Sequence, residues 1–322
     1  MHKRLVNYFT LELSLCPCGP ILIKSGQEGA DPSKPAMEFV ETLYKQDQSI
    51  YLPGSSLKGA LRAQAERIVR TVGSDRRPEN PAKLWAADPL KLEEYEYLDQ
   101  QEKDKKKKKE GAEIYKLSSF TDQIFGSIAI ASRFRIEDAY PEDMEALKIE
   151  ERNGVAIDRV FGSVANGPFN YEVCTAGSFK TKLHLKNFSL AQLGLIALVL
   201  RDLNDGWFGI GFAKSRGLGQ VEVQVEKATI QYPSCVLEGD EIRLMGRNFN
   251  PPNCSILGAG EFLGAEAEGY GYPQPDHQRT SVEAAPMPFN FGVQQVWQGN
   301  AIYHDLFPQV VQSWSQIVEV AA

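Results

Sequence analysis

Two short stretches of this 322-residue chain combine residue types that suit phosphate binding. In the first, residues 51–72, Pro53 and Gly54 predict a turn, and Ser55, Ser56 and Lys58 follow at a predicted helix start. Free backbone N–H groups at a helix start, together with hydroxyl and ammonium groups, can hold a phosphate. The same pattern is typical of an ordinary amphipathic helix with a serine cap, so the stretch by itself leaves both interpretations open.

The second stretch, residues 207–225, carries a lysine and an arginine inside a glycine-rich segment. Its glycines are Gly209, Gly211, Gly217 and Gly219. Glycines let backbone N–H groups approach a phosphate, and Lys214 and Arg216 supply positive charge. The segment precedes a predicted strand, whereas a dinucleotide-binding fingerprint follows one, and no Walker-type sequence is present. A glycine-rich hairpin turn is the alternative interpretation.

Hydrophobic spacing predicts the elements that position these stretches. An apolar stripe predicts a helix from residue 55, and its members are Leu57, Leu61, Ala65, Ile68 and Val72. Residues 189–203 predict a second helix, with Ser189 as a candidate cap. Alternating apolar residues predict strands within residues 8–18, 128–136, 171–174, 179–185 and 221–225. This order favours an α+β fold with a ferredoxin-like or RNA-recognition-motif (RRM)-like core.

Two segments depart from this pattern. Residues 73–116 are charged, contain few branched aliphatic residues and are predicted to be an insertion. Its lysine run, Lys105–Lys109, is typical of a solvated insertion, although an arm for nucleic acid and a targeting signal are alternatives. Residues 239–322 are rich in Gly, Pro and Ala, and we expect a long irregular C-terminal extension with a last helix within residues 305–320. The predicted domain therefore spans residues 1–238.

The composition limits the class of protein. A hydrophobic content of 43% supports a folded core, and no apolar run is long enough to span a bilayer. No signal sequence is recognised, so we expect a cytoplasmic protein. The net charge of −7 argues mildly against nucleic-acid binding, but binding needs only a local basic face. The five cysteines form no CxxC pair or Cys/His cluster, which predicts free thiols and no zinc site.

Four segments resemble motifs of the RAMP superfamily, the repeat-associated proteins of CRISPR effector complexes, and occur in the same order. They are LPGSSLKGALR at residues 52–62, IFGSIAIASRFRIEDA at 124–139, VAIDRVFG at 155–162 and GIGFAKSRGLGQVEV at 209–223. The third segment leads into what resembles the family's thumb hairpin, here at about residues 155–185 with its tip at 161–168. Periodicity alone does not distinguish such a hairpin from an ordinary meander.

The order of these features looks most like the repeating backbone subunit of type III effector complexes. The resemblance implies an antiviral ribonucleoprotein whose partners are CRISPR guide RNA, target RNA and other effector subunits. It also implies that the thumb kinks the guide–target duplex. The implied RNA contacts are Ser55, Ser56, Lys58, Arg62, Arg133, Arg159, Lys214 and Arg216.

The resemblance further implies Mg²⁺-dependent endonucleolytic cleavage of target RNA by an aspartate in the loop before the first helix. Here that loop, residues 24–35, contains Asp31 and Glu28. Asp31 matches the chemistry and is the expected Mg²⁺ ligand, while Glu28 is closer by one count of the spacing. Both are also consistent with solvated loop carboxylates, which would make the chain a non-cleaving structural subunit. A stand-alone guide-RNA-processing endoribonuclease is a third hypothesis, but the four histidines fall outside the recognised motifs.

Overall fold

The structure is a computed structural model, and it describes most of the chain. The described residues are 4–25, 35, 37–80, 83–91, 110–246 and 249–321. Glu28, Asp31 and Lys105–Lys109 therefore lie outside the described residues. Within the described ranges, no helix has the length and apolar character needed to cross a membrane.

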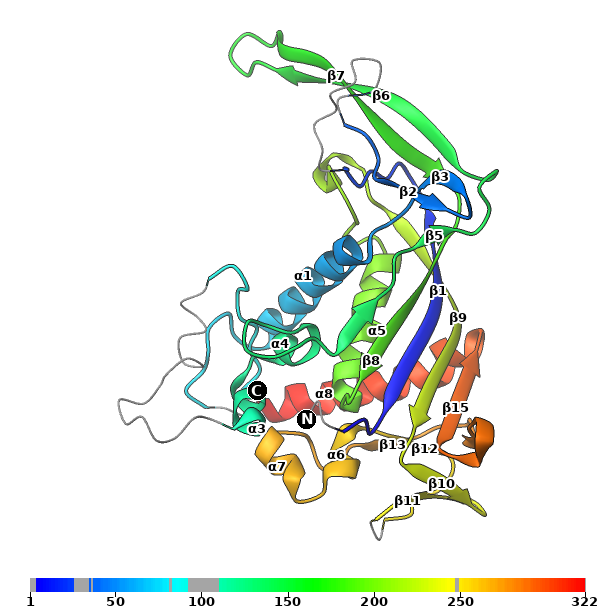
Figure 1. Ribbon diagram of the computed structural model, residues 1–322. Coiled ribbons are helices and arrows are strands. Elements are labelled where there is room, and N and C mark those ends of the chain that lie inside the picture. Colours follow the sequence, from blue (N-terminus) through cyan, green and yellow to red (C-terminus); the bar gives the residue numbers. More distant parts are fainter. Residues whose placement is uncertain are drawn as a thin grey trace.

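A four-strand, two-helix unit forms the centre of the fold (Figure 1). Its elements in chain order are β1 (Tyr8–Pro17), α1 (Gly54–Val72), β4 (Phe134–Ile136), β8 (Phe179–Lys186), α5 (Leu190–Asn204) and β9 (Val221–Tyr232). The strands lie in the order β9-β1-β8-β4, and each neighbouring pair is antiparallel. This βαββαβ connection is the ferredoxin-like arrangement, so the predicted fold class is confirmed.

The buried residues explain why these segments adopt these elements. Along β1, Phe9, Leu11 and Leu13 point into the core while the residues between them are less buried, which is the period of a half-covered strand. At the start of α5, the Ser189 hydroxyl accepts a hydrogen bond from the backbone N–H of Gln192, and the Gln192 side chain accepts one from the backbone N–H of Ser189. This capping box confirms the predicted cap and helix start.

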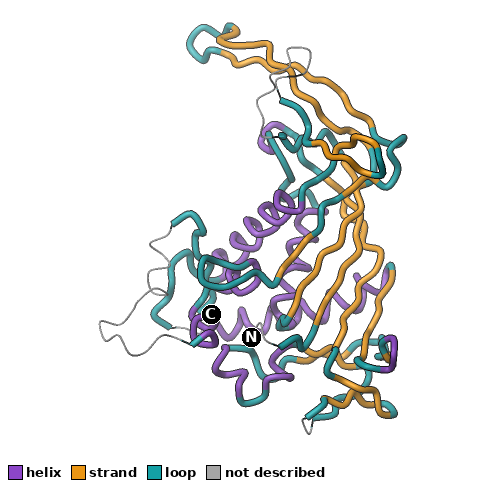
Figure 2. Tube along the Cα trace, in the orientation of Figure 1, coloured by secondary structure: helices purple, strands orange, loops and turns teal. Residues whose placement is uncertain are grey.

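The helices lie on one side of the sheet (Figure 2). Between β1 and α1 the chain forms a hairpin of β2 (Glu41–Tyr44) and β3 (Asp47–Ile50). The predicted insertion ends within α3 (Gly111–Leu117), and α4 (Phe120–Phe125) follows it. Residues 128–132, expected to begin a strand, instead form a turn before β4, and β5 (Tyr140–Pro141) pairs with β8.

A long hairpin projects from the rest of the molecule (Figure 1). It consists of β6 (Lys148–Ile157) and β7 (Val164–Ala176), which pair with each other as a two-stranded sheet. The expected thumb boundaries of 155–185 are therefore wrong at both ends. Residues 179–186 form β8, whose buried side chains face the core and whose backbone pairs with β1, so they belong to the central sheet.

The C-terminal extension is regular, which corrects the expectation of an irregular tail. The hairpin of β10 (Cys235–Glu238) and β11 (Glu241–Leu244) spans the predicted boundary. The extension continues with β12 (Ser255–Leu257), α6 (Ala259–Leu263), α7 (Glu266–Tyr270), β13 (His277–Arg279), β14 (Ala285–Pro286), β15 (Val293–Gln298) and α8 (Phe307–Ala321). Strand β15 pairs with β9 and lengthens the central sheet, and it contributes the fully buried Trp297. Helix α8 agrees with the last helix predicted within residues 305–320.

Helix α8 packs closely on α5. A Cβ at Gly194 of α5 would lie 2.2 Å from the carbonyl oxygen of Val310, so only glycine permits this approach. The extension thus shares the core of the preceding residues, and residue 238 does not separate two independent cores.

Candidate nucleic-acid interface

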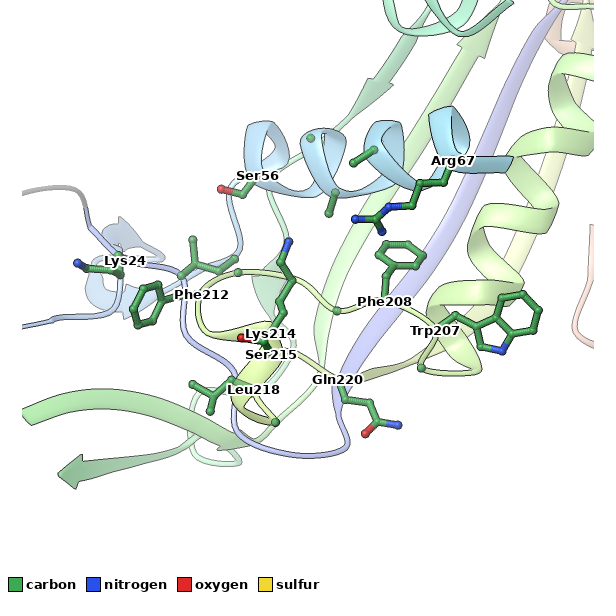
Figure 3. Close-up of a pocket in the computed structure, with 18 residues that line it drawn as sticks. Lys24, Ser56, Arg67, Trp207, Phe208, Phe212, Lys214, Ser215, Leu218 and Gln220 are labelled. Carbon is green, nitrogen blue, oxygen red and sulfur yellow. The ribbon is translucent and has the colours of Figure 1, made fainter. Parts of the chain in front are cut away.

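A cleft of about 760 Å³ separates α1 from the loop that follows α5 (Figure 3). The α1 wall consists of Ser56, Gly59, Ala60, Ala63 and Arg67. The opposite wall is the glycine-rich loop of residues 206–220, and Ile23 and Lys24 line one end. The cleft therefore joins the two stretches whose composition suits phosphate.

The α1 wall is a single side of the helix, because its residues recur three and four positions apart. Four of the five carry small side chains, which leave room for a bulky ligand to approach the helix. Arg67 follows Ser56 by eleven positions, about three helical turns, and its guanidinium group lies above the ring of Phe208 in Figure 3. That spacing was the signal that could have identified Arg67 from the sequence.

The loop wall has a backbone shape that glycine makes possible. Gly211 has φ +75°, and a Cβ there would lie 2.2 Å from the carbonyl oxygen of Leu22. The next residue, Phe212, donates its backbone N–H to the same carbonyl at 2.7 Å. The loop is therefore held against Leu22, in the segment that follows β1. At its exposed end, Lys214–Arg216 forms a short 3-10 turn.

Cations and aromatic rings alternate along the cleft. The Lys24 ammonium group lies 5.3 Å and the Arg216 guanidinium carbon 5.1 Å from the centroid of the Phe212 ring. These are distances at which a cation is attracted to a ring. The Lys214 side chain extends toward α1 in Figure 3. Lys24, Phe208 and Phe212 were not singled out from the sequence, since they gain a role only when the loop folds against Lys24.

The start of α1 differs from the expectation. The helix begins at Gly54, follows Pro53 and has no side-chain cap from Ser55 or Ser56. Instead, Asp138 accepts the backbone N–H of Gly54 at 2.7 Å through Oδ1. The predicted serine cap is therefore wrong. The Asp138 carboxylate accepts a hydrogen bond from a backbone N–H group that the sequence predicts to be free for phosphate. Ser56 is exposed on the cleft wall, and Ser55 is exposed next to it.

Lys58 and Arg62 lie outside the cleft and face the segment before β4. The Lys58 ammonium group donates to the Ser132 hydroxyl at 2.9 Å, and burial, with a smaller contribution from Arg62, lowers the pKa of Lys58. Arg62 contacts Glu66 at 2.7 Å and Asp122 at 2.8 Å. Arg62 thus holds two buried carboxylates. RNA contact by Lys58 stays a prediction.

Arg133 is a buried structural residue, which corrects its assignment as an RNA contact. Only 3% of it is exposed, and its guanidinium carbon lies 3.8 Å from the ring centroid of Tyr115. It donates to the Asn187 carbonyl at 3.1 Å and to the Tyr272 hydroxyl. Protein groups surround this side chain, so an RNA backbone has no access to it.

Arg159 is exposed in the turn that joins β6 to β7, apart from the cleft. Asp158 shapes this turn by accepting the backbone N–H groups of Phe161 at 2.9 Å and Val160 at 2.7 Å. These two hydrogen bonds lower the pKa of Asp158. The turn presents Val160 and Phe161 at the tip with 84% and 83% of their surfaces exposed.

The described residues on either side of Glu28 and Asp31 contact the cleft and the projecting hairpin. On one side Lys24, which lines the cleft, forms a β-bridge with Phe39. On the other, Met37 bridges to Tyr171 of β7. Among the described residues, no three His, Cys, Asp or Glu side chains gather as a metal site. Magnesium at Asp31 and the lack of zinc both stay predictions.

The chain matches a known protein family. The family model of the RAMP superfamily matches residues 17–222, from the end of β1 to the start of β9. This range includes both walls of the cleft and the projecting hairpin. A search of curated proteins found no match.

Proposed function

The chain belongs to the RAMP superfamily, a family of CRISPR-associated RNA-binding proteins, and we propose that it is a guide-RNA-binding backbone subunit of a type III CRISPR effector complex. One observation carries this proposal: the cleft between α1 and the glycine-rich loop gathers Lys24, Arg67 and Lys214 beside small residues and aromatic rings. This local basic surface outweighs the net charge of −7 as an argument about RNA.

The cleft suits a guide RNA because its contacts would go to the backbone. Lysine and arginine side chains bind phosphate oxygens, and such contacts carry no sequence information. The small residues of α1 leave space for the ribose-phosphate chain. A subunit of this kind holds guides of different sequence, and base pairing with the target supplies the specificity.

The guide-RNA proposal predicts a defined RNA partner. When the chain is produced in cells that express a CRISPR array and the other effector subunits, the complex should contain short RNAs of uniform length. The purified chain should bind single-stranded RNA with an affinity that falls as salt rises. Gel analysis of extracted RNA and a salt titration measure these results. An RNA-free complex, or binding that ignores salt, would contradict the proposal, and cutting of precursor RNA by the chain alone would indicate a processing enzyme instead.

The projecting hairpin supports the thumb assignment within this proposal. Apolar side chains that insert between stacked bases can unstack and kink a duplex. Val160 and Phe161 are apolar, exposed and held at the tip by Asp158. We therefore assign the thumb to residues 148–176, with Phe161 as its leading side chain, and Arg159 as a phosphate contact beside it.

As a second part of the proposal, the subunit cleaves target RNA with Asp31 or Glu28. The described residues that flank them in the chain contact both features: Lys24 lines the cleft and Met37 bridges to the thumb, where guide and target would meet. Carboxylate oxygens are the donors that Mg²⁺ prefers, so these residues fit that ion. Bound Mg²⁺ would stabilise negative charge that develops on the cleaved phosphate.

Cleavage is tested with Asp31→Ala and Glu28→Ala in the assembled complex. The variant that removes the catalytic carboxylate should slow the cut opposite this subunit by about 10²- to 10⁴-fold, with guide-RNA content unchanged. Asp75→Ala, which removes an exposed carboxylate elsewhere, is the matched control. Product mapping on labelled target RNA gives the readout. Full cleavage by both variants would make the chain a non-cleaving structural subunit.

A further inference from the structure

Trp207 is an exposed tryptophan at the α5 end of the cleft (Figure 3). Of its surface, 69% is exposed, whereas the other three tryptophans, all within the described residues, are 0–6% exposed. Figure 3 shows its ring beyond Phe208, next to α5. A large exposed ring beside a cleft that holds cations is a candidate contact surface, because nucleobases stack on such rings.

The position of Trp207 is fixed by its neighbours. Its backbone N–H donates to the Asp202 carbonyl oxygen at 2.9 Å, which closes the turn after α5. The guanidinium carbon of Arg201 lies 5.6 Å from the Trp207 ring centroid. Arg201 in turn donates to Asp202 Oδ1 at 2.7 Å and 3.1 Å. The carboxylate of Asp202 is 1% exposed, so this ion pair is well shielded from water on one side.

The buried Asp202 carboxylate also contacts α1, the opposite wall of the cleft. Gln64 of α1 donates to Asp202 Oδ2 at 2.8 Å. Arg67 donates to Gln64 Oε1 at 3.3 Å. A continuous set of contacts therefore runs from Trp207 through Arg201, Asp202 and Gln64 to Arg67. It places one aromatic ring and two guanidinium groups together at this end of the cleft.

We propose that Trp207 is a stacking platform for an unpaired nucleobase of the RNA that lies in the cleft. Tryptophan rings and arginine planes stack on the faces of nucleobases, and every base offers such a face. Arg67 and Arg201 lie where they can meet the phosphates on either side of that base. This inference rests on the proposed function, since the RNA in the cleft delivers the base.

Fluorescence isolates this contact, because Trp207 is the exposed emitter among four tryptophans that are all described. A short oligoadenylate should quench part of the emission of the full chain, since a stacked base quenches tryptophan. Inorganic polyphosphate, which offers phosphates without bases, should bind the cleft without that quench. Trp207→Phe should remove the quench and keep RNA affinity within a fewfold of the wild type.

Variants test the energy of the contact. Trp207→Ala and Trp207→Leu should each weaken oligoadenylate binding by about tenfold, because both lose the stacking surface while Leu keeps apolar volume. Phe289→Ala, which removes a fully exposed ring outside the cleft, should leave affinity unchanged. Affinities come from anisotropy titrations with labelled RNA at fixed salt.

The outcomes separate the two proposals. RNA that binds in a salt-dependent way without quenching, or with equal affinity for wild type and Trp207→Ala, overturns the stacking site and leaves the guide-RNA function standing. Loss of complex assembly in Trp207→Ala with unchanged RNA affinity also overturns it, and assigns Trp207 to a protein contact. Absence of any RNA binding by the wild type refutes the proposed function and the stacking site together.

Discussion

Replacing Arg67 and Lys214 together with alanine is expected to weaken guide-RNA binding by about a hundredfold at low salt. The two residues approach the cleft from opposite walls, Arg67 from α1 and Lys214 from the glycine-rich loop. Each would lose a charge-assisted contact with a phosphate group. Because both are exposed, their loss should leave the fold intact, so the variant separates RNA binding from stability.

The salt dependence gives a second readout of the same change. Each phosphate contact to a single strand contributes about 0.7 to the slope of log affinity against log salt. The double variant should therefore reduce that slope by roughly 1.4. The control is Arg76→Ala with Lys83→Ala, which removes the same charge from exposed positions outside the cleft. Equal losses from the two pairs would show that total charge, not the cleft, determines binding.

Replacing Arg62 with alanine is expected to destabilise the protein by about 3–5 kcal/mol. The side chains of its partners Asp122 and Glu66 are 1% and 8% exposed. Removing the guanidinium group takes one cation away from two buried carboxylates, of which Glu66 still contacts Arg70 at 3.3 Å, and the lost pairing is costly. Arg62 also donates to the Gly126 carbonyl at 2.8 Å, so the turn before β4 loses an anchor.

Denaturant unfolding measures this loss, and the same helix supplies the control. Arg67→Ala, five positions along α1, should change the free energy of unfolding by only about 0.5 kcal/mol. Adding Asp122→Ala to Arg62→Ala should recover part of the stability, because it removes a buried carboxylate that has lost its contact with Arg62. If Arg62→Ala keeps full stability and instead loses RNA affinity, its original assignment as an RNA contact is correct.

The two predictions differ because the polar side of α1 has two functions. The sequence of α1 indicates an apolar stripe and places lysine and arginine outside it. It does not indicate which polar residues meet the segment before β4 and which meet the glycine-rich loop. Lys58 and Arg62 lie on the first side, and Ser56 and Arg67 on the second. That division depends on neighbours 60 or more residues away.

Local signals in the sequence determined the order of the core elements, the capped start of α5 and the glycine-rich loop with Lys214. These features depend on residues a few positions apart, through helical spacing, alternation and turn chemistry. The tertiary structure decided the rest. It buried Arg133 between tyrosines and joined the extension to the sheet through β15. It also placed the Asp138 carboxylate where it accepts the first backbone N–H of α1. Each of these depends on which distant element excludes water from a side chain, and local spacing carries no information about that.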